Sequence, residues 1–452
     1  MLVILVTLSA TAIIQSWALG LAGSASKETK NILVVDEVLA GGGKWIIVYL
    51  RNTGAFSVNV SFAVLLRGGH VIKTWDISPS KCVPPYSVKA ICLETGGLEP
   101  GIYTIKVFTE SGDLTVRSFR LNDPEEVEIE EVYQAIGWSF YREVTIKEES
   151  GEDLIGYPIL IELNKDNFDF KKAKSDGSDI RFLDLNGEKL SYWIESFDSE
   201  KGEAKIWVKL NDLSANGKKV IRMYYGNPEA TDESSPTDVF SFYEDFENYV
   251  DGQDLTAADW SSRTWVNFGE QGDVNWIVEG VKDNMAVYVQ VEGTPDRSIL
   301  YKPLSQVFAK YAISMKVKPS RKLSLGLLIS AFDAGHWYTL TVTSPDSRSS
   351  RIELIQNIDS DTKWWGYYYY MFSSDEWYNI EVQIRDNEIR GVLINGEPVG
   401  GFNGFTLEYG LKLVGFYVGV GSGSDGFLDS IILRKWVEPE PYVEVGEEHA
   451  LT

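Results

Sequence analysis

Residues 375–400 read DEWYNIEVQIRDNEIRGVLINGEPVG, and this stretch decides the fold class. Apolar and polar residues alternate in its two runs, WYNIEVQIR and GVLINGEPV, and polar turn residues separate the runs. Alternation with a period of two is typical of a half-buried β-strand, and two such runs around a short turn indicate a hairpin. The stretch therefore predicts two neighbouring antiparallel strands.

The same pattern fills most of the chain. Between residue 239 and about residue 437 the alternating runs include YAISMKVKP, LGLLISAF, WYTLTVTS and FLDSIILRKW, and near the start NILVVDEVLAGGGKWIIVYL reads as strand, glycine turn, strand. Strands at this spacing suggest sandwiches, and 452 residues are too many for one ordinary core. We expect a mainly β protein with one long N-terminal hydrophobic α-helix and three consecutive β-sandwich or jelly-roll domains.

The expected helix comes from residues 1–26, which carry no charged side chain. A signal peptide, a membrane anchor and an assembly helix are the alternatives. Small residues along the segment favour close helix packing, and a helix that is apolar all round must be buried all round. We therefore favour an assembly helix. Its packing positions would be Leu2, Ile4, Leu5, Leu8, Ala12, Ile13, Ile14, Trp17, Leu19 and Leu21.

The expected domains follow from these patterns. They are a hydrophobic helix at 1–28, a β-sandwich head at 29–122, an acidic linker at 123–136, a middle domain at 137–236 and a jelly roll with a C-terminal strand at 237–452.

The first 122 residues resemble archaeal type IV pilins. The resemblance rests on the apolar segment, the polar stretch GSASKETK and the strand residues Val48, Tyr49, Arg51, Asn52, Thr53 and Gly54. It implies a filament whose core is built from the helices, with copies of the chain as partners and contact with a membrane only before assembly. Leu5 stands where bacterial relatives carry Glu, which weakens the resemblance slightly.

Two further resemblances cover the rest. A family known as domain of unknown function 2341 is matched over about 137–235 by Trp138, Tyr141, Arg142, Asp176, Gly177, Asp179, Ile180, Arg181, Phe182, Trp193, Trp207, Tyr225, Gly226 and Asn227. The family assigns no chemistry, and we interpret Asp176, Asp179 and Asp184 as turn residues rather than metal ligands. Residues 239–446 resemble the laminin G and concanavalin A-like fold, and the tail RKWVEPEPYVEVGEE resembles the segment that closes this pairing of domains.

The charge excludes one class of partner. The net charge is −24; residues 1–123 carry +2, so residues 124–452 carry −26. Nucleic acid binding needs clustered cations, which argues against that function. An acidic outer surface suits solubility and spacing between neighbouring copies.

Three residues bear on the location of the chain. Cys82 and Cys92, ten residues apart, predict one disulfide and an oxidising compartment, with two buried free thiols as the alternative. Asn59 begins the only N-x-[ST] sequon, which makes it a candidate glycosylation site. Together with the pilin resemblance they predict an extracellular, cell-surface filament.

Three candidate sites lie in the last domain. We expect no enzyme, because the closely paired carboxylates of sandwich glycosidases are absent. No cofactor is certain; a structural Ca²⁺ is a candidate, with Asp245, Glu247 and Asp429 as ligands. The run KWWGYYYYMF places Trp365, Tyr367 and Tyr369 on one strand face and Trp364, Tyr368 and Tyr370 on the other. One face would fill the core, and the other would bind glycans, pack against a neighbour or simply cover an edge.

We therefore expect a structural subunit of an archaeal type IV pilus-like filament whose outer domains serve adhesion or glycan binding. The alternative is a surface protein held in the membrane by a single helix, with outer domains that bind carbohydrate.

Overall fold

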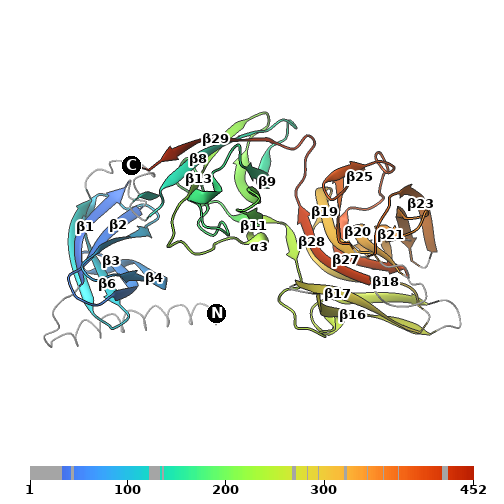
Figure 1. Cartoon of the computed structure of the whole chain (residues 1–452), viewed down its shortest axis with the longest axis horizontal. Coiled ribbons are helices and arrows are strands. Elements are labelled where there is room, and N and C mark those ends of the chain that lie inside the picture. Colours follow the sequence, from blue (N-terminus) through green and yellow to red (C-terminus); the bar gives the residue numbers. More distant parts are fainter. Residues whose placement is uncertain are drawn as a thin grey trace.

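A computed structural model describes residues 33–41, 45–121, 133–134, 137–266, 271–281, 284–293, 295–319, 323–343, 345–359, 361–374, 376–419 and 426–451. Of these described residues, 64% lie in strands and 3% in helices. The strands form three units, which we call the head, middle and large units, and Figure 1 shows the middle unit between the other two.

The expected fold class is wrong on the helix. Helix among the described residues is limited to α3 (Pro236–Val239), the 3-10 turns η1 (Phe170–Lys172) and η2 (Leu255–Ala257), and residues 133–134. The protein is nearly all β there, with several sandwiched sheets. The segment 1–28, including the predicted packing positions from Leu2 to Leu21, lies outside the described residues. No helix in the described ranges has the length and hydropathy that a membrane-spanning helix needs.

The head unit is a sandwich of two sheets, with strand orders β1-β2-β5 and β4-β3-β6-β7. Its strands are β1 (Leu33–Gly41), β2 (Trp45–Asn52), β3 (Val58–Arg67), β4 (His70–Val83), β5 (Val88–Glu94), β6 (Gly101–Thr109) and β7 (Leu114–Leu121). Alternate residues of each strand point inward, so Ile46, Val48 and Leu50 of β2 meet Ile105 and Val107 of β6 in one core.

The middle unit has sheets ordered β10-β13-β8-β29 and β11-β12-β9. Its strands are β8 (Phe140–Lys147), β9 (Leu154–Asn164), β10 (Arg181–Asp184), β11 (Tyr192–Asp198), β12 (Glu203–Leu213), β13 (Lys218–Tyr225) and β29 (Tyr442–Ala450). Figure 1 shows β29, the last strand of the chain, running along β8.

The large unit packs a sheet of order β16-β17-β28-β19-β24-β25-β26, with β14 also paired to β28, against one of order β15-β18-β27-β20-β21-β22-β23. Its strands are β14 (Phe242–Glu244), β15 (Ser261–Val266), β16 (Gly272–Val281), β17 (Asn284–Gly293), β18 (Pro295–Phe308), β19 (Lys310–Lys318), β20 (Ser324–Asp333), β21 (His336–Thr343), β22 (Arg351–Ile358), β23 (Asp361–Tyr369), β24 (Tyr378–Arg385), β25 (Glu388–Ile394), β26 (Glu397–Val399), β27 (Leu411–Gly419) and β28 (Gly426–Arg434).

The hairpin predicted from residues 375–400 is confirmed. Tyr378, Ile380, Val382 and Ile384 of β24 are buried, while the residues between them are more exposed. Asp386 and Asn387 of the turn have φ of 52° and 62°, the left-handed pair that suits the right-handed twist of a hairpin. The turn residues and the buried residues therefore both favour the observed pairing of β24 with β25.

The end of the chain departs from the expected domain limits. The prediction assigned all of 237–452 to the jelly roll, but β29 pairs with β8 and so completes a sheet of the middle unit. Val443 and Val445 pack against the core of that unit. The chain thus leaves the middle unit, builds the large unit and returns.

The predicted disulfide is not formed, and both cysteines are free thiols. Their spacing suggested two facing positions of one hairpin. Instead, Cys82 lies on β4, opposite Asn59, and Cys92 lies on β5, opposite Ile47, so the two strands belong to different sheets. Burial raises the pKa of the Cys92 thiol to about 12.

Ion pairs at a buried junction join the middle and large units. The Arg434 guanidinium, 6% exposed, lies 3.1 Å from Glu381 and 2.5 Å from Glu440 and stacks 5.0 Å from the ring of Trp207 on β12. Glu152 of the middle unit adds ion pairs of 2.7 Å and 2.8 Å to Lys310 and Arg385 of the large unit. We call the group of Arg434, Glu381 and Glu440 the arginine junction.

The head and middle units are joined by both charge and apolar contact. Glu229 of the middle unit binds Lys81, at 3.2 Å, and Lys89, both from the head. The hydrogen bond from Lys89 is the largest favourable contribution that lowers the pKa of Glu229, working against desolvation. Ile47 and Ala90 of the head pack into a shared cluster with Leu183 and Tyr224.

We expect Arg434→Met to lower the free energy of unfolding of the transition that includes the large unit by about 2 to 4 kcal/mol. The substitution leaves two carboxylates facing each other at a buried junction, and the loss is moderated by the partial exposure of Glu440. Chemical denaturation of the full chain measures it. Adding Glu381→Gln should recover part of the loss, because one uncompensated charge is removed.

Lys201→Met is the matched control, since the Lys201–Asp198 pair has exposed fractions of 75% and 40%. It should leave the free energy of unfolding nearly unchanged, because an exposed ion pair contributes little to stability. An Arg434→Met protein as stable as the parent would show that the junction does not hold the two units together.

We expect unequal alkylation of the two cysteines in the folded chain near neutral pH. Cys82 is exposed, whereas Cys92 is largely buried and its raised pKa leaves almost no thiolate. Peptide mass spectrometry after brief iodoacetamide treatment should find Cys82 modified and Cys92 protected. Equal protection of both, lost on reduction, would instead indicate a disulfide.

Candidate binding surface

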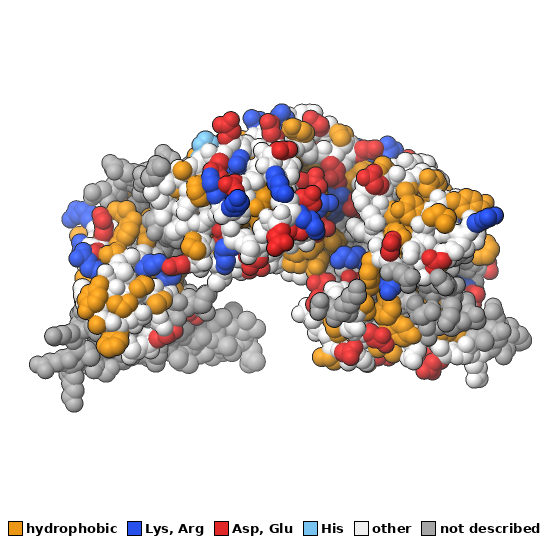
Figure 2. Space-filling model, viewed as in Figure 1, with side chains coloured by type: hydrophobic (Ala, Val, Ile, Leu, Met, Phe, Trp, Pro, Cys, Tyr) orange, Lys and Arg blue, Asp and Glu red, His pale blue; other side chains and the backbone are white. Residues whose placement is uncertain are grey.

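Strand β23 is the outermost strand of the seven-stranded sheet, at the end of the large unit away from the middle unit (Figure 1). Every residue of β23 is exposed except Gly366, which is half-buried. Figure 2 shows hydrophobic side chains gathered on this end of the molecule. An exposed patch of this kind commonly marks a binding surface.

A bulge decides which side chains of β23 share a face. The pairing with β22 shifts between Leu354 and Ile355, which lie opposite Gly366 and Trp364, so Trp365 is the extra residue. Residues directly opposite each other on neighbouring strands point to the same side of a sheet. Trp364 therefore shares the side of Ile355, which is opposite to the side of Leu354.

The predicted division of the aromatic run is consequently wrong. Tyr367 and Tyr369 lie opposite Glu353 and Arg351, on the same outer side as Trp364. Tyr368 lies opposite Ile352, a residue of the main core, and is on the inner side. Strict alternation grouped Trp365 with Tyr367 and Tyr369, because it could not register the extra residue.

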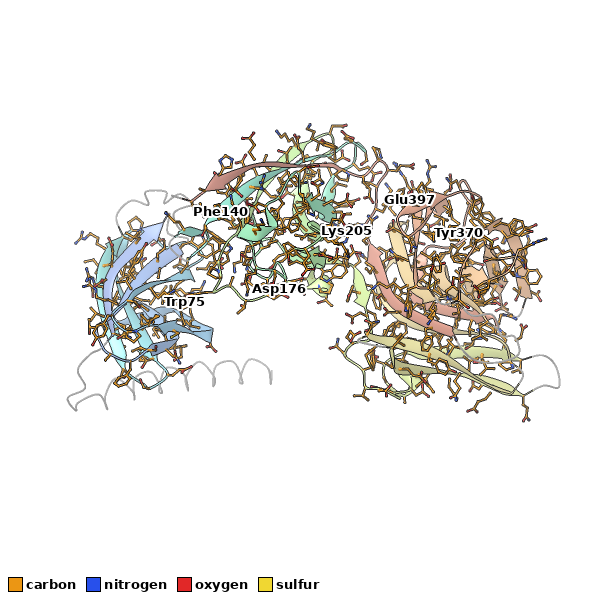
Figure 3. The ribbon with its side chains drawn as sticks, viewed as in Figure 1. Trp75, Phe140, Asp176, Lys205, Tyr370 and Glu397 are labelled. Carbon is orange, nitrogen blue, oxygen red and sulfur yellow. The ribbon has the colours of Figure 1, made fainter. Side chains whose placement is uncertain are left out.

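The inner aromatic residues contribute to packing. Trp365 donates a hydrogen bond of 2.9 Å to Gln356 Oε1 and meets the ring of Phe405 edge-on at 5.2 Å. Tyr368 lies so close to Gly401 that a Cβ there would come within 3.0 Å of it. Tyr370, labelled in Figure 3, packs against Phe372 with a centroid distance of 4.7 Å.

The outer side carries three aromatic residues that we call the outer aromatic row: Trp364, Tyr367 and Tyr369. Their exposed fractions are 75%, 56% and 58%. Tyr367 and Tyr369 contact each other at 5.1 Å, with their rings 69° apart. These fractions are high for large aromatic side chains, so burial in this chain does not account for them.

A charged pair lies beside the row. Arg351 donates from Nε to Glu353 Oε1 at 2.7 Å, and its guanidinium lies 5.4 Å from the ring of Tyr367. Both charged residues sit on β22 directly opposite Tyr369 and Tyr367. Sequence reasoning missed the pair as part of a surface. In the segment RIEL, residues 351–354, the two charged residues alternate with apolar ones. This alternation places Arg351 and Glu353 on the side of the outer aromatic row only when the pairing of β22 with β23 is known.

Away from the row, the outer side of this sheet is already filled. Trp337, Tyr417 and Ile355 belong to a second apolar cluster there, and Trp265 covers it. Trp265 is held between the guanidinium groups of Arg263 and Arg297, at 4.8 Å and 4.9 Å. The row therefore forms an open rim beside a closed apolar surface.

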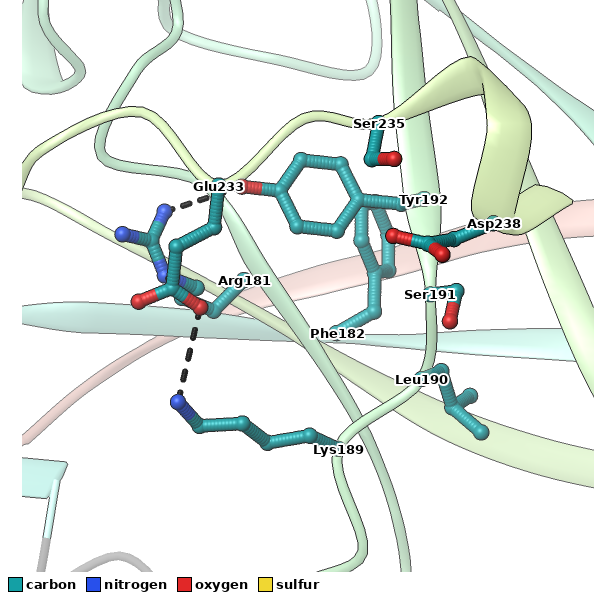
Figure 4. Close-up of a pocket in the computed structure, with 9 residues that line it drawn as sticks. All are labelled: Arg181, Phe182, Lys189, Leu190, Ser191, Tyr192, Glu233, Ser235 and Asp238. Atoms are coloured by element: carbon teal, nitrogen blue, oxygen red, sulfur yellow. Dashed lines mark hydrogen bonds and ion pairs between the residues drawn. The ribbon is translucent and has the colours of Figure 1, made fainter.

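The middle unit contains a small polar pocket of ≈ 180 Å³ (Figure 4). Glu233 pairs with Arg181 at 3.2 Å and Lys189 at 3.4 Å, and Arg181 also donates to the hydroxyl of Tyr192 at 2.9 Å. The opposite charges in this pocket thus compensate one another, and the arrangement holds the segment after β13 against β10.

A larger cavity of ≈ 560 Å³ lies between the head and middle units. Cys82 and Cys92 both line it, together with Trp138 and Arg181. Lys81 and Glu229, which also line this cavity, form the ion pair described above. The cavity is thus a gap in a contact between two units.

The predicted calcium ligands do not come together. Among the described residues no three His, Cys, Asp or Glu side chains form a possible metal site. Asp429, 2% exposed, accepts hydrogen bonds from Asn284 and from the Ser430 backbone, and burial raises its pKa. Glu247 accepts from the backbone of Met285, and Asp245 accepts from Tyr243. Each carboxylate is therefore engaged within the protein.

The remaining candidate residues lie in the head and middle units. Asp179 accepts from the backbone of Lys174, Gly226 and Asn227, while Asp176 and Asp184 accept from Ser178 and Asn186, which is the turn role expected for them. Asn59 is exposed on β3 and donates to Glu110 at 2.9 Å. Its glycosylation stays a prediction.

The family described as domain of unknown function 2341 matches residues 176–265. This range begins later and ends later than the 137–235 suggested by the sequence motifs, and it extends into β15. The match supports the resemblance of the middle unit to that family. No comparison supports a pilin-like segment at the start of the chain.

Comparisons with whole proteins give weak likenesses. No curated protein matches the chain. Among solved structures, the carbohydrate binding module CBM66 from Bacillus subtilis is 10% identical, with a TM-score of 0.27, covering 36% of this chain and 95% of that one. Sheep galectin-11 gives 11% identity and a TM-score of 0.21, covering 29% and 95% of the chains. The GH43 protein BlXynB from Bacillus licheniformis gives 11% and 0.27, covering 88% and 85%. Scores this low establish neither a shared activity nor a shared site.

Proposed function

We propose that this chain is a non-catalytic glycan-binding protein of the cell surface, and that the outer aromatic row is its binding surface. The observation that carries the proposal is the exposure of Trp364, at 75%, with Tyr367 and Tyr369 beside it. Aromatic side chains are costly to leave in water, and the packing contacts of this strand with the rest of the large unit are made by the inner residues Trp365 and Tyr368.

The chemistry of the row suits a sugar. The faces of Trp and Tyr rings offer flat apolar surface against which the C–H faces of a sugar ring can stack. The tyrosine hydroxyls and the Arg351–Glu353 pair add donors and acceptors at the edge of that surface. A few polar groups around an aromatic surface are what fixes the orientation of a polar ligand.

Filament assembly and the absence of glycosidase activity stay predictions from the sequence. Polymerisation into a filament would depend on residues 1–28, which lie outside the described residues. Hydrolysis of glycosidic bonds would need two suitably spaced carboxylates, and we expect no such activity, which a reducing-sugar assay would test. An extracellular location is part of the proposal.

We expect Trp364→Ala to weaken glycan binding at least about tenfold while leaving stability nearly unchanged. The substitution removes the most exposed ring of the row, whereas exposed side chains contribute less than about 0.5 kcal/mol to folding. Affinity electrophoresis of the full chain in gels containing soluble polysaccharides measures binding, and thermal unfolding measures stability. Retardation that persists unchanged in Trp364→Ala would exclude the row as the binding surface.

Two variants make this experiment specific. Phe56→Ala removes a 79% exposed ring from the head unit and should not affect binding. Trp365→Ala should lower the melting temperature, because it removes the contact with Phe405 and the hydrogen bond to Gln356. If all three variants behave alike, the effect on binding is not a property of the outer side of β23.

A further inference from the structure

We propose that the ligand of the outer aromatic row is a linear, uncharged glycan whose chain lies along β23. This inference rests on the proposed function and adds to it the class and the direction of the ligand.

The direction of the bound glycan chain follows from the positions of the three aromatic residues along β23. Trp364, Tyr367 and Tyr369 project from one side of one strand, and at about 3.3 Å per residue they extend over roughly 16 Å. That length accommodates several sugar rings in succession. On the side towards the sheet centre, the cluster around Trp265 and Trp337 is closed. A linear chain can lie along this narrow rim, which offers little surface to a branched one.

We infer that the ligand is uncharged from the way the cationic side chains near the outer aromatic row are engaged. Arg351 is paired with Glu353 at 2.7 Å. Lys363 lies on the inner side, where its ammonium group is 3.4 Å from the ring centroid of Trp365. The whole chain carries a net charge of −24, which disfavours approach of a polyanion. The row itself consists of neutral side chains.

The edge of β23 argues against a protein strand as the occupant. An unpaired edge invites pairing with another strand, and proteins block this with bulges and inward-pointing charges. β23 has both: the bulge at Trp365 interrupts the ladder, and Lys363 points to the inner side. The backbone edge is thus guarded while the ring faces on the outer side remain accessible, which favours a ligand that stacks on side chains.

The test titrates the full chain with linear neutral manno- and cello-oligosaccharides, from disaccharide to hexasaccharide, followed by tryptophan fluorescence. Affinity should increase with chain length until the row is covered. Tyr369→Ala should reduce the affinity for the hexasaccharide about tenfold and leave that for the disaccharide nearly unchanged. Tyr442→Ala, which removes a 49% exposed ring of the middle unit, should change neither.

A second arm compares mannan with alginate and polygalacturonate at low and high salt. Binding of mannan should not depend on salt, because no ion pair is screened. Tighter, salt-sensitive binding of the polyuronates that is still lost in Trp364→Ala would overturn the uncharged class and keep the proposed function. Equal affinity for short and long oligosaccharides would overturn the direction along the strand.

Two outcomes would overturn the proposed function as well. One is the failure of every glycan tested to bind. The other is self-association of the chain in sedimentation experiments that Trp364→Ala abolishes, because the row would then be an interface between copies.

Discussion

The return of the chain from the large unit to the middle unit is the constraint on which the arrangement of these two units depends. A sandwich sheet that ended at β8 would leave part of its core uncovered. β29 supplies the missing strand, and Val443 and Val445 cover that core. Because β29 follows directly from the large unit, two covalent connections cross between the units, and rotation of one against the other is restricted.

The arginine junction then fixes the angle between these units. A guanidinium that is 6% exposed must be paired, and its planar group reaches Glu381, Glu440 and the face of Trp207 at once. These partners come from a strand of the large unit, the returning segment and the middle unit. The geometry holds only when all three are in place.

Much of the fold could be predicted from the sequence, because strands with one buried face have a readable period. The β24–β25 hairpin is predicted by alternation and by two residues that accept a left-handed turn. The segment around Cys82 and Cys92 shows the limit of such reasoning. Spacing along the chain suggested a facing pair, yet the strands enter different sheets. The partner of a strand is decided by tertiary packing, which no local pattern records.

The candidate surface shows the same limit at the scale of one residue. Composition alone identified the aromatic run, but one extra residue at Trp365 exchanges the faces of Trp364 and Trp365 relative to the tyrosines. A bulge of this kind depends on the pairing of β23 with β22, so it could not be predicted from the period of the sequence pattern.

The bulge also links the fold to the proposed function. It lets Trp365 and Tyr368 of β23, and Tyr370 just after it, contact the body of the large unit, while Trp364, Tyr367 and Tyr369 lie on the other side and are more than half exposed. Rings that only pack would be expected to lie on one face, the buried one. The division of six aromatic residues, five on the edge strand and Tyr370 just after it, between two faces therefore separates a packing role from a binding role within residues 364–370. Stability and recognition can then change independently at this site.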